Sequence, residues 1–419
     1  MPRAANTLTR GLPLFLAATL LGLALLGTVP HRPAERVGSV ALAVPRGPYL
    51  PGSRVRVAIT GLFAPYRVSL LGPGSLDGLV YTVPNVTAPT TATLIAGAPG
   101  AAAIAELRLV PAPPLSQGLI AVASYDAGIV LHDSHTFAIV GYVPIGGAPG
   151  DVAFGRDGTI AAPDTDGDSL ALARRSPWRI EAFPGVALGN EIASDPASGA
   201  FFVSDRDIAG YGGLTRVSAG GAVTRVRTGI TSEGLAVDAR RRVVYVGNVN
   251  DASVTAVDAD TMTVRRRIAS VPRTFGIALD ERRRRLYVVS NTSASMHGGG
   301  GFVAAIDLSG KRERIAARSA RLAFPLGVAY DAAGDRVFVT DEEANVVYVL
   351  DARTLRPLRA PLRTCDTPWR PHIDRATHRL FVPCTRANAV DVFDLRSLRR
   401  VAHAPFATGG FPLGIATWK

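Results

Sequence analysis

Seven side chains that could bind a small ligand are distributed along this 419-residue chain at recurring intervals. Trp369 and Arg370 are adjacent, and a planar aromatic ring next to a cation suits a sugar or a carboxylate ligand. The full set is Asp151, Glu191, Glu233, Arg273, Trp369, Arg370 and His372. We expect a binding site if the fold brings these residues together, and an ordinary solvated surface if it does not.

Two acidic runs have the composition of cation sites. Asp164, Asp166 and Asp168 lie in one run, Asp-Thr-Asp-Gly-Asp, and hard carboxylate oxygens suit Ca²⁺. The run lacks the spacing and the distal glutamate of an EF-hand loop. The second run is Asp341-Glu-Glu343. Turns also favour aspartate because its side chain caps backbone amides, so capping is the alternative for both runs. We expect no other metal or cofactor.

The sequence contains no convincing catalytic constellation. His132-x-x-His135 has metal-like spacing but no third ligand nearby, and we interpret it as coincidental. Motifs of serine hydrolases, haem attachment and phosphate loops are absent from the sequence. Met296-His-Gly-Gly-Gly-Gly301 is a glycine-rich loop, which is either a lid over a site or an unconstrained insertion. A binding protein is therefore favoured over an enzyme.

The only two cysteines, Cys365 and Cys384, lie close together near the end of the chain. Cys365 precedes one expected strand, and Cys384 directly follows the next strand, Leu380–Pro383. Antiparallel neighbours place the start of one strand beside the end of the other, within the Cα separation of about 4–7 Å that a disulfide requires. We predict one disulfide and an oxidising compartment, with two buried free thiols as the alternative.

A repeated unit of four strands positions all of these residues. In Ala236–Asn248 and Ser253–Asp258, β-branched or aromatic runs are bounded by Asp, Asn or Gly, which is typical of antiparallel hairpins. Equivalents of Gly234 recur at spacings of 40, 43, 42, 51, 43 and 44 residues, which match propeller blades. These anchor positions are Asp151, Glu191, Gly234, Gly276, Gly327, Arg370 and Gly414. We predict an all-β fold with a seven-bladed β-propeller over 119–419, in which strand 414–418 completes the first blade.

Strand direction assigns the turns of this propeller to two faces. The loops entering the first strand of each blade, and the hairpins between second and third strands, lie on the face called the top. The ligand candidates lie at or beside the anchors, so we expect an unknown small-molecule or protein ligand at the top mouth of the channel. The bottom carries Arg240–Arg242 and Arg282–Arg285 among acids. These arginines are either solvated or in contact with an anionic surface.

The repeat resembles that of the YVTN family of β-propellers (the YncE-like group). Tyr245-Val-Gly-Asn248 differs from the family tetrapeptide at one position, and Val254–Thr261 is similar to the strand and turn that follow it. The resemblance covers residues 119–418, and it is weakest in the first two blades; in the second, Thr159-Ile-Ala-Ala162 replaces the tetrapeptide strand. It implies an exported binding or scaffold protein and no particular activity.

Three segments precede the repeats. Residues 1–30 contain two arginines and then an uncharged run, Gly11–Val29, whose length as a helix is close to the thickness of a bilayer. This pattern predicts export, with the segment either a cleaved signal peptide or a helical membrane anchor. In residues 38–110, apolar and polar residues alternate as in the strands of a β-sandwich. The segment resembles the immunoglobulin-like modules of bacterial surface proteins. Residues 111–118 form a proline-rich linker.

Charge limits the function classes. The net charge of +12 comes from 46 basic and 34 acidic residues, but nearly all of the basic residues are arginine. This indicates a bias of codon composition, and we do not expect nucleic-acid binding. We expect a monomeric, extracytoplasmic ligand- or protein-binding module of the cell envelope. A lactonase- or lyase-type propeller enzyme with an axial polar site, and a structural surface-layer protein, are the alternatives.

Overall fold

The computed structural model describes residues 41–419 except 45–46, 62–65, 99–100, 144, 146, 207–211, 293–299 and 311. The chain divides into a unit of Met1–Ser39 and a unit of Val40–Lys419, and the described residues all belong to the second. The predicted export segment, 1–30, and most of the loop that begins at Met296 lie outside them. In the described ranges, no helix has the length and apolar character needed to cross a membrane.

Eight short strands between residues 41 and 109 surround one small core. A two-stranded sheet consists of β1 (Ala41–Ala43) and β3 (Ala58–Thr60). Two three-stranded sheets consist of β2 (Arg54–Arg56), β6 (Val80–Thr82) and β5 (Ser75–Asp77), and of β4 (Arg67–Leu71), β7 (Thr90–Ala98) and β8 (Ala101–Leu109). Val55, Tyr81, Leu94 and Leu107 are buried between the sheets, because alternate residues of a strand point to the same side.

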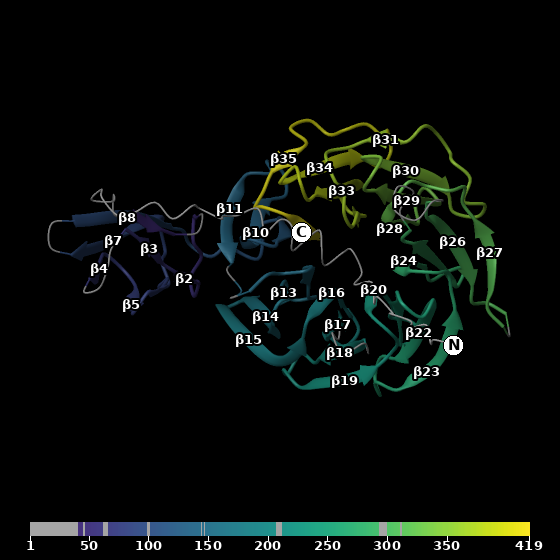
Figure 1. Ribbon diagram of the computed structural model, residues 1–419, viewed down its shortest axis with the longest axis horizontal. Coiled ribbons are helices and arrows are strands. Elements are labelled where there is room, and N and C mark those ends of the chain that lie inside the picture. Colours follow the sequence, from purple (N-terminus) through teal and green to yellow (C-terminus); the bar gives the residue numbers. More distant parts are fainter. Residues whose placement is uncertain are drawn as a thin grey trace, which may run out of the picture. The chain divides into compact units, whose positions relative to one another are not determined.

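Residues 119–419 form seven antiparallel sheets of four strands, numbered here as sheets 1 to 7 in chain order (Figure 1). Sheet 1 contains β9 (Leu119–Ser124), β10 (Gly128–Asp133), β11 (Ile139–Val143) and the C-terminal strand β36 (Pro412–Trp418). As predicted, β36 pairs with β9, with Gly414 opposite Ala123 and Trp418 opposite Leu119. The two ends of this region are therefore joined by one antiparallel ladder.

Sheets 2 to 7 each contain four consecutive strands. Sheets 2 and 3 contain β12 (Ala153–Phe154), β13 (Ile160–Pro163), β14 (Asp168–Arg175), β15 (Trp178–Ala187), β16 (Gly189–Ser194), β17 (Phe201–Asp205), β18 (Gly213–Val217) and β19 (Val223–Arg227). Sheets 4 and 5 contain β20 (Ser232–Asp238), β21 (Val243–Asn248), β22 (Ser253–Asp258), β23 (Val264–Ala269), β24 (Thr274–Asp280), β25 (Arg285–Ser290), β26 (Phe302–Asp307) and β27 (Arg314–Arg318). Sheets 6 and 7 contain β28 (Pro325–Asp331), β29 (Arg336–Asp341), β30 (Val346–Asp351), β31 (Leu362–Arg363), β32 (His372–Asp374), β33 (Arg379–Cys384), β34 (Ala389–Asp394) and β35 (Phe406–Ala407). The sheets stand around a common axis, which is the arrangement of a β-propeller (Figure 1).

The hydrophobic core lies between neighbouring sheets. Tyr245 and Val254 of sheet 4, for example, share one buried cluster with Ile277 and Val288 of sheet 5. The inner strands of a sheet are covered on both faces, so a strand such as β21 is buried along its length, whereas an outer strand such as β23 is largely exposed.

A repeated aspartate turn closes the hairpin between the third and fourth strands. Asp258 Oδ1 accepts hydrogen bonds from two backbone N–H groups of its turn, at 3.0 and 2.8 Å. Met262 then adopts a left-handed φ of 55°. Asp351 and Asp394 cap the equivalent turns of sheets 6 and 7 in the same way. The aspartates at strand ends therefore specify these turns.

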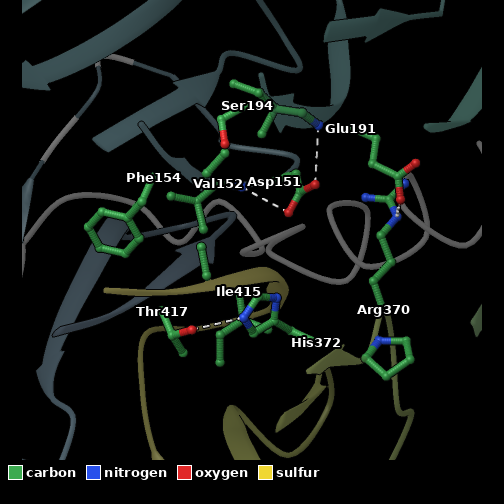
Figure 2. Close-up of a pocket in the computed structure, with 13 residues that line it drawn as sticks. Asp151, Val152, Phe154, Glu191, Ser194, Arg370, His372, Ile415 and Thr417 are labelled. Atoms are coloured by element: carbon green, nitrogen blue, oxygen red, sulfur yellow. Dashed lines mark hydrogen bonds and ion pairs between the residues drawn. The ribbon is translucent and has the colours of Figure 1, made fainter. Parts of the chain in front are cut away.

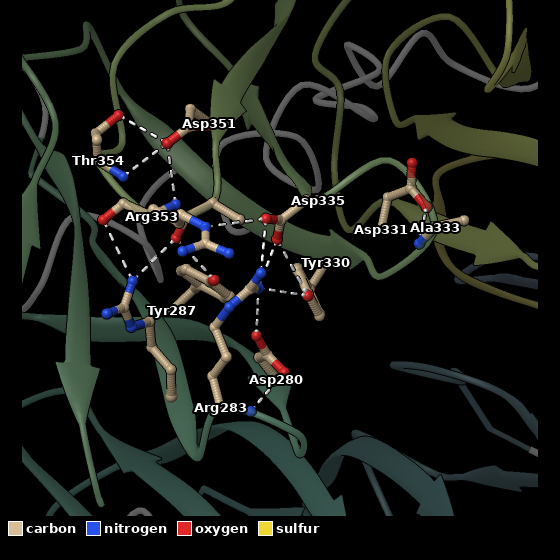
Figure 3. A network of polar contacts seen from close by, with 12 residues as sticks. Asp280, Arg283, Tyr287, Tyr330, Asp331, Ala333, Asp335, Asp351, Arg353 and Thr354 are labelled. Carbon is tan, nitrogen blue, oxygen red and sulfur yellow. Dashed lines mark hydrogen bonds and ion pairs between the residues drawn. The ribbon is translucent and has the colours of Figure 1, made fainter.

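Several arginines of the bottom face are paired with acids. Arg283 bridges Asp280 of its own sheet and Asp335 of sheet 6, at 2.9 and 2.5 Å, and donates to the hydroxyl of Tyr330 at 3.0 Å (Figure 3). Arg353 lies 3.5 Å from Asp335 in the same network. These contacts join the turns of sheets 5 and 6 and neutralise part of the positive charge of this face.

The predicted disulfide between Cys365 and Cys384 is present, with its Cα atoms 5.8 Å apart. It joins the segment that precedes β32 to the end of β33. The N–H of Trp369 donates to the carbonyl of Pro383 at 2.8 Å and holds the same segment. A disulfide of this kind is typical of proteins in oxidising compartments.

Candidate functional site

The innermost strands of the sheets approach one another closely at the four glycine anchors, Gly234, Gly276, Gly327 and Gly414. A β-carbon added at Gly234 would lie 2.1 Å from the carbonyl oxygen of Phe275 in the next sheet. One at Gly276 would lie 2.7 Å from the carbonyl oxygen of Leu326, and one at Gly327 would lie 2.4 Å from Pro371 Cδ. No side chain fits at these positions unless the neighbouring strand moves away from the axis.

The anchors of sheets 2, 3 and 7 are charged residues, Asp151, Glu191 and Arg370. Each directly precedes an inner-strand residue equivalent to Leu235, which follows Gly234. The inner strands leave room beside these three anchors, and a cavity of about 340 Å³ opens there. Its lining comes from the inner strands of sheets 7, 1, 2 and 3. The lining residues that carry the argument below are Asp151, Phe154, Glu191, Ser194, Arg370, His372 and Thr417 (Figure 2).

Arg370 is the centre of an ion cluster at the charged end of this cavity. Its Nε lies 3.2 Å from Glu191 Oε1 and one terminal nitrogen lies 3.4 Å from Glu233 Oε2. The other terminal nitrogen donates to the carbonyl of Gly150 at 3.3 Å. Glu233 also pairs with Arg206. The side chain of Arg370 is only 11% exposed, so its charge is balanced by these carboxylates and not by water.

Asp151 connects sheets 2 and 3. Its two carboxylate oxygens accept hydrogen bonds from the backbone N–H groups of Val152, at 2.9 Å, and of Ile192, at 3.2 Å. Burial raises the pKa of Asp151 to about 6, although the nearby Arg370 guanidinium and both N–H groups act in the opposite direction.

Glu191 has an incomplete set of contacts. Burial raises its pKa to about 8, and the negative charges of Asp151 and Glu233 add to this effect, whereas Arg370 lowers it. A backbone hydrogen bond from Leu235 to the carboxylate also lowers this pKa, but Oε2 itself is buried without a hydrogen-bond partner among the described residues. This oxygen is therefore an unused acceptor beside the cavity, and such an atom is costly to bury without a partner.

His372 occupies a position where the other six sheets carry alanine. The six equivalents, each two residues beyond its anchor, are Ala153, Ala193, Ala236, Ala278, Ala329 and Ala416. The imidazole Nε2 lies 3.0 Å from Thr417 Oγ1 of the neighbouring strand β36 (Figure 2). Burial lowers the pKa of His372 to about 4, so its ring is neutral at pH 7.

Five of the seven predicted ligand residues come together. Asp151, Glu191, Arg370 and His372 line the cavity, and Glu233 joins them through Arg370. The other two, Arg273 and Trp369, do not line it.

The two remaining candidates have other partners. Arg273 Nε donates to the carbonyl of Asn291 at 2.6 Å. Trp369 packs against an apolar cluster and meets Phe275 edge-on, with the ring centroids 6.4 Å apart. Both therefore contribute to the packing of the top loops.

Among the cavity residues that were not candidates are Phe154, Ser194 and Thr417. Each stands three residues beyond the anchor of its sheet, at Asp151, Glu191 and Gly414. Counting three positions from every anchor would have found them.

The two other candidate sites have structural explanations. Asp164 Oδ1 accepts hydrogen bonds from two backbone N–H groups, at 3.2 and 3.1 Å, and Asp166 accepts one from the hydroxyl of Tyr125 at 2.6 Å. No group of three or more His, Cys, Asp or Glu that could hold a metal ion was found in the described part of the chain, and the calcium site at Asp164, Asp166 and Asp168 stays a prediction. His132 is buried, with its ring nitrogens 2.9 Å from a backbone carbonyl and 3.0 Å from Thr408 Oγ1.

Comparison with known proteins identifies the fold. No family model and no curated protein matches the sequence. A functionally unknown protein from Desulfotomaculum acetoxidans is 14% identical, with 72% of this chain and 99% of that chain covered and a TM-score of 0.58. A putative 6-phosphogluconolactonase from Bacteroides fragilis is 10% identical, with 73% and 98% covered and a TM-score of 0.58. A protein from Lactobacillus plantarum is 11% identical, with 72% and 99% covered and a TM-score of 0.58. These similarities show a β-propeller fold.

Proposed function

We propose that this chain is an exported, YVTN-like seven-bladed β-propeller that binds a small organic molecule in the axial cavity. The proposal rests on one observation. Three anchors, Asp151, Glu191 and Arg370, carry charged side chains, and the cavity opens beside these three. Ligand pockets typically combine apolar walls with a few oriented polar groups. Val152 and Ile415 supply apolar wall in this cavity, and the ion cluster supplies the polar groups.

Other features of the chain support the remaining parts of the proposal. The pairing of β36 with β9 supports a closed ring, because it joins the two ends of the propeller region in one sheet. Tyr245-Val-Gly-Asn248 lies in β21, the second strand of sheet 4, as the family resemblance requires. The disulfide and the uncharged run 11–29 support an extracytoplasmic location, with the sandwich of residues 41–109 as a spacer.

Ligand-observed NMR with a chemically mixed fragment library tests the binding function. Ser194 lines the cavity and forms no side-chain hydrogen bond with the described residues, so Ser194→Phe fills the space without removing a partner. Ser69→Phe, at an exposed position of β4, is the matched control. We expect fragments that bind the wild type and the control but not Ser194→Phe. Binding that is equal in all three proteins, or no binding at all, would refute an axial ligand site.

A lactonase- or lyase-type enzyme is the second candidate. It is favoured by the raised pKa values of Asp151 and Glu191, because carboxyl groups that titrate near neutral pH suit general acid–base chemistry. The test is hydrolysis or ring opening of a panel of sugar lactones, followed by NMR. Turnover by the wild type that is lost in Asp151→Asn and in Glu191→Gln would establish this alternative.

The presence of the cavity argues against the third alternative, a purely structural role.

A further inference from the structure

Each nitrogen of Arg370 at the charged end already has an acceptor nearby. Nε forms an ion pair with Glu191, one terminal nitrogen donates to Glu233, and the other donates to the carbonyl of Gly150. An incoming carboxylate would have to displace one of these acceptors and enter beside two buried carboxylates. Arg370 is therefore poorly placed to bind the anionic ligand that its sequence position beside Trp369 suggests.

An acceptor, in contrast, is available. Glu191 Oε2 is buried and has no hydrogen-bond partner among the described residues. Three carboxylates, those of Asp151, Glu191 and Glu233, gather here around the guanidiniums of Arg370 and Arg206. At neutral pH the proton on Glu191 keeps the cluster neutral; once that proton leaves and all five groups are ionised, the cluster carries one negative charge in excess. A positively charged donor would satisfy the free oxygen and neutralise that charge.

The other end of the cavity is apolar. Phe154 stands at the far side from Glu191 and Arg370 in Figure 2, and its ring lies 5.9 Å from that of Trp418. Val152, Ile192 and Ile415 form the wall between the two ends. A molecule that fits this outline has a hydrophobic body at one end and a donor group at the other.

We propose that the ligand is a small organic ammonium compound, with its cationic nitrogen at Glu191 Oε2 and its hydrophobic body against Phe154. This inference rests on the proposed function, because it specifies the ligand class of the same cavity. The ammonium group forms a charge-assisted hydrogen bond with Glu191, which is stronger than a bond between neutral groups.

Binding of such a ligand is coupled to proton release. The groups facing Glu191 are Asp151 from sheet 2, Glu233 from sheet 4, and Arg370 and the neutral His372 from sheet 7. Burial and the two acids keep a proton on Glu191 at neutral pH, and an ammonium ion displaces it. Calorimetry at pH 7 in two buffers of different ionisation enthalpy should show the release of about one proton per molecule bound.

The test uses three probes of similar shape: 2-phenylethylamine, 2-phenylethanol and 3-phenylpropionate. Binding to the full exported chain is measured by calorimetry and by the thermal unfolding midpoint at pH 7. We expect the amine to bind and to raise the midpoint, whereas the alcohol and the acid do neither. Glu191→Gln should weaken amine binding at least about tenfold, which corresponds to 1.4 kcal/mol. Glu281→Gln, on the bottom face, is the matched control and should bind the amine as the wild type does.

The outcomes separate this inference from the proposed function. If the alcohol or the acid binds as well as the amine, and Ser194→Phe abolishes that binding, the cavity is a ligand site but the ammonium class is wrong. Amine binding that survives Glu191→Gln also overturns the ammonium assignment. If none of the three probes binds, the ammonium assignment falls, and the fragment experiment above then decides whether the cavity binds any molecule.

Discussion

Gly414 and Asp151 lie so close together that a β-carbon on Gly414 would be 1.9 Å from Asp151 Oδ1 and 2.7 Å from Asp151 Cα. The contact joins the last strand of the chain to the first anchor of the cavity. The contact involves the backbone of Asp151 as well as its side chain. Rotation of the carboxylate alone therefore cannot make room for a larger residue at position 414.

Gly414→Ala should therefore destabilise the propeller. We expect a loss of about 1–3 kcal/mol, the usual cost of overpacking, together with a displaced Asp151. Thermal unfolding measures the loss. Gly220→Ala is the control, since the nearest atom to a β-carbon there is 3.9 Å away, and it should leave the midpoint unchanged. Equal midpoints for Gly414→Ala and the wild type would show that the strands are not packed this tightly.

Arg370→Met should destabilise the protein more strongly. The substitution keeps the volume but leaves Glu191 without its cation, whereas Glu233 retains Arg206. Breaking a buried ion pair on one side costs about 3 kcal/mol, and the full loss appears only where Glu191 is ionised, above its pKa of about 8. The loss should shrink at pH 5, where Glu191 holds a proton. Arg396→Met, at an exposed position, is the control. An equal loss at pH 5 and pH 8 in chemical denaturation would contradict the ion-pair explanation.

The stability of the wild type should fall as pH rises from 7 to 8.5. The pKa of Glu191 is raised from an ordinary 4.5 to about 8, so the folded state holds its proton more tightly than the unfolded chain does. Ionising Glu191 therefore costs stability up to about pH 8, and the contribution is constant above it.

The substitution Glu191→Gln isolates this contribution. Burial raises the pKa of Asp151 only to about 6 and lowers that of His372 to about 4, so these two groups have largely finished titrating below this range. Glu342, whose pKa burial raises to about 7, still titrates in the lower part of the range, but it does so equally in the wild type and in both variants. Thermal midpoints of Glu191→Gln should be flatter between pH 7 and 8.5 than those of the wild type and of Glu281→Gln. Parallel curves for all three proteins would mean that Glu191 is not the titrating group.

Replacing both cysteines should loosen the segment that carries Arg370. The disulfide closes a loop with a sequence separation of 19, and the chain-entropy model gives it about 3 kcal/mol. In Cys365→Ala/Cys384→Ala we expect a lower midpoint and faster amide hydrogen exchange in residues 365–370, while exchange in sheets 4 and 5 stays slow. Unchanged exchange at 365–370 would show that hydrogen bonds alone, such as that from Trp369 N–H to Pro383, hold this segment.

The repeat, the closing strand and the disulfide could be predicted because they depend on local pattern. Aspartate turns and β-branched runs recur about every 43 residues, and that period determines which strands are neighbours. Once the strands are neighbours, the positions of Cys365 and Cys384 on adjacent strands follow. The charged anchors could be located for the same reason.

The contacts inside the site depend on the direction in which each side chain points. The spacing of the sequence repeat does not predict that direction. Trp369 and Arg370 are adjacent in sequence, but successive residues of an extended chain point to opposite sides. Arg370 therefore faces the cavity, whereas Trp369 joins the apolar cluster with Phe275. Arg273 has a left-handed φ of 52°, and its side chain bonds to the carbonyl of Asn291. The pairing of Arg370 with two acids, which reverses the expected charge of the ligand, likewise required the three-dimensional structure.

A crystallographic fragment screen tests the central claim, an axial ligand site, most directly. Crystals of the exported chain would be soaked with amines, alcohols and carboxylates of similar size, and every bound fragment would be located by its density. We predict that fragments concentrate in the cavity lined by Asp151, Glu191, Arg370 and His372, with amine nitrogens within hydrogen-bond distance of Glu191 Oε2. Fragments found only on outer surfaces, with the cavity holding nothing but water, would contradict it.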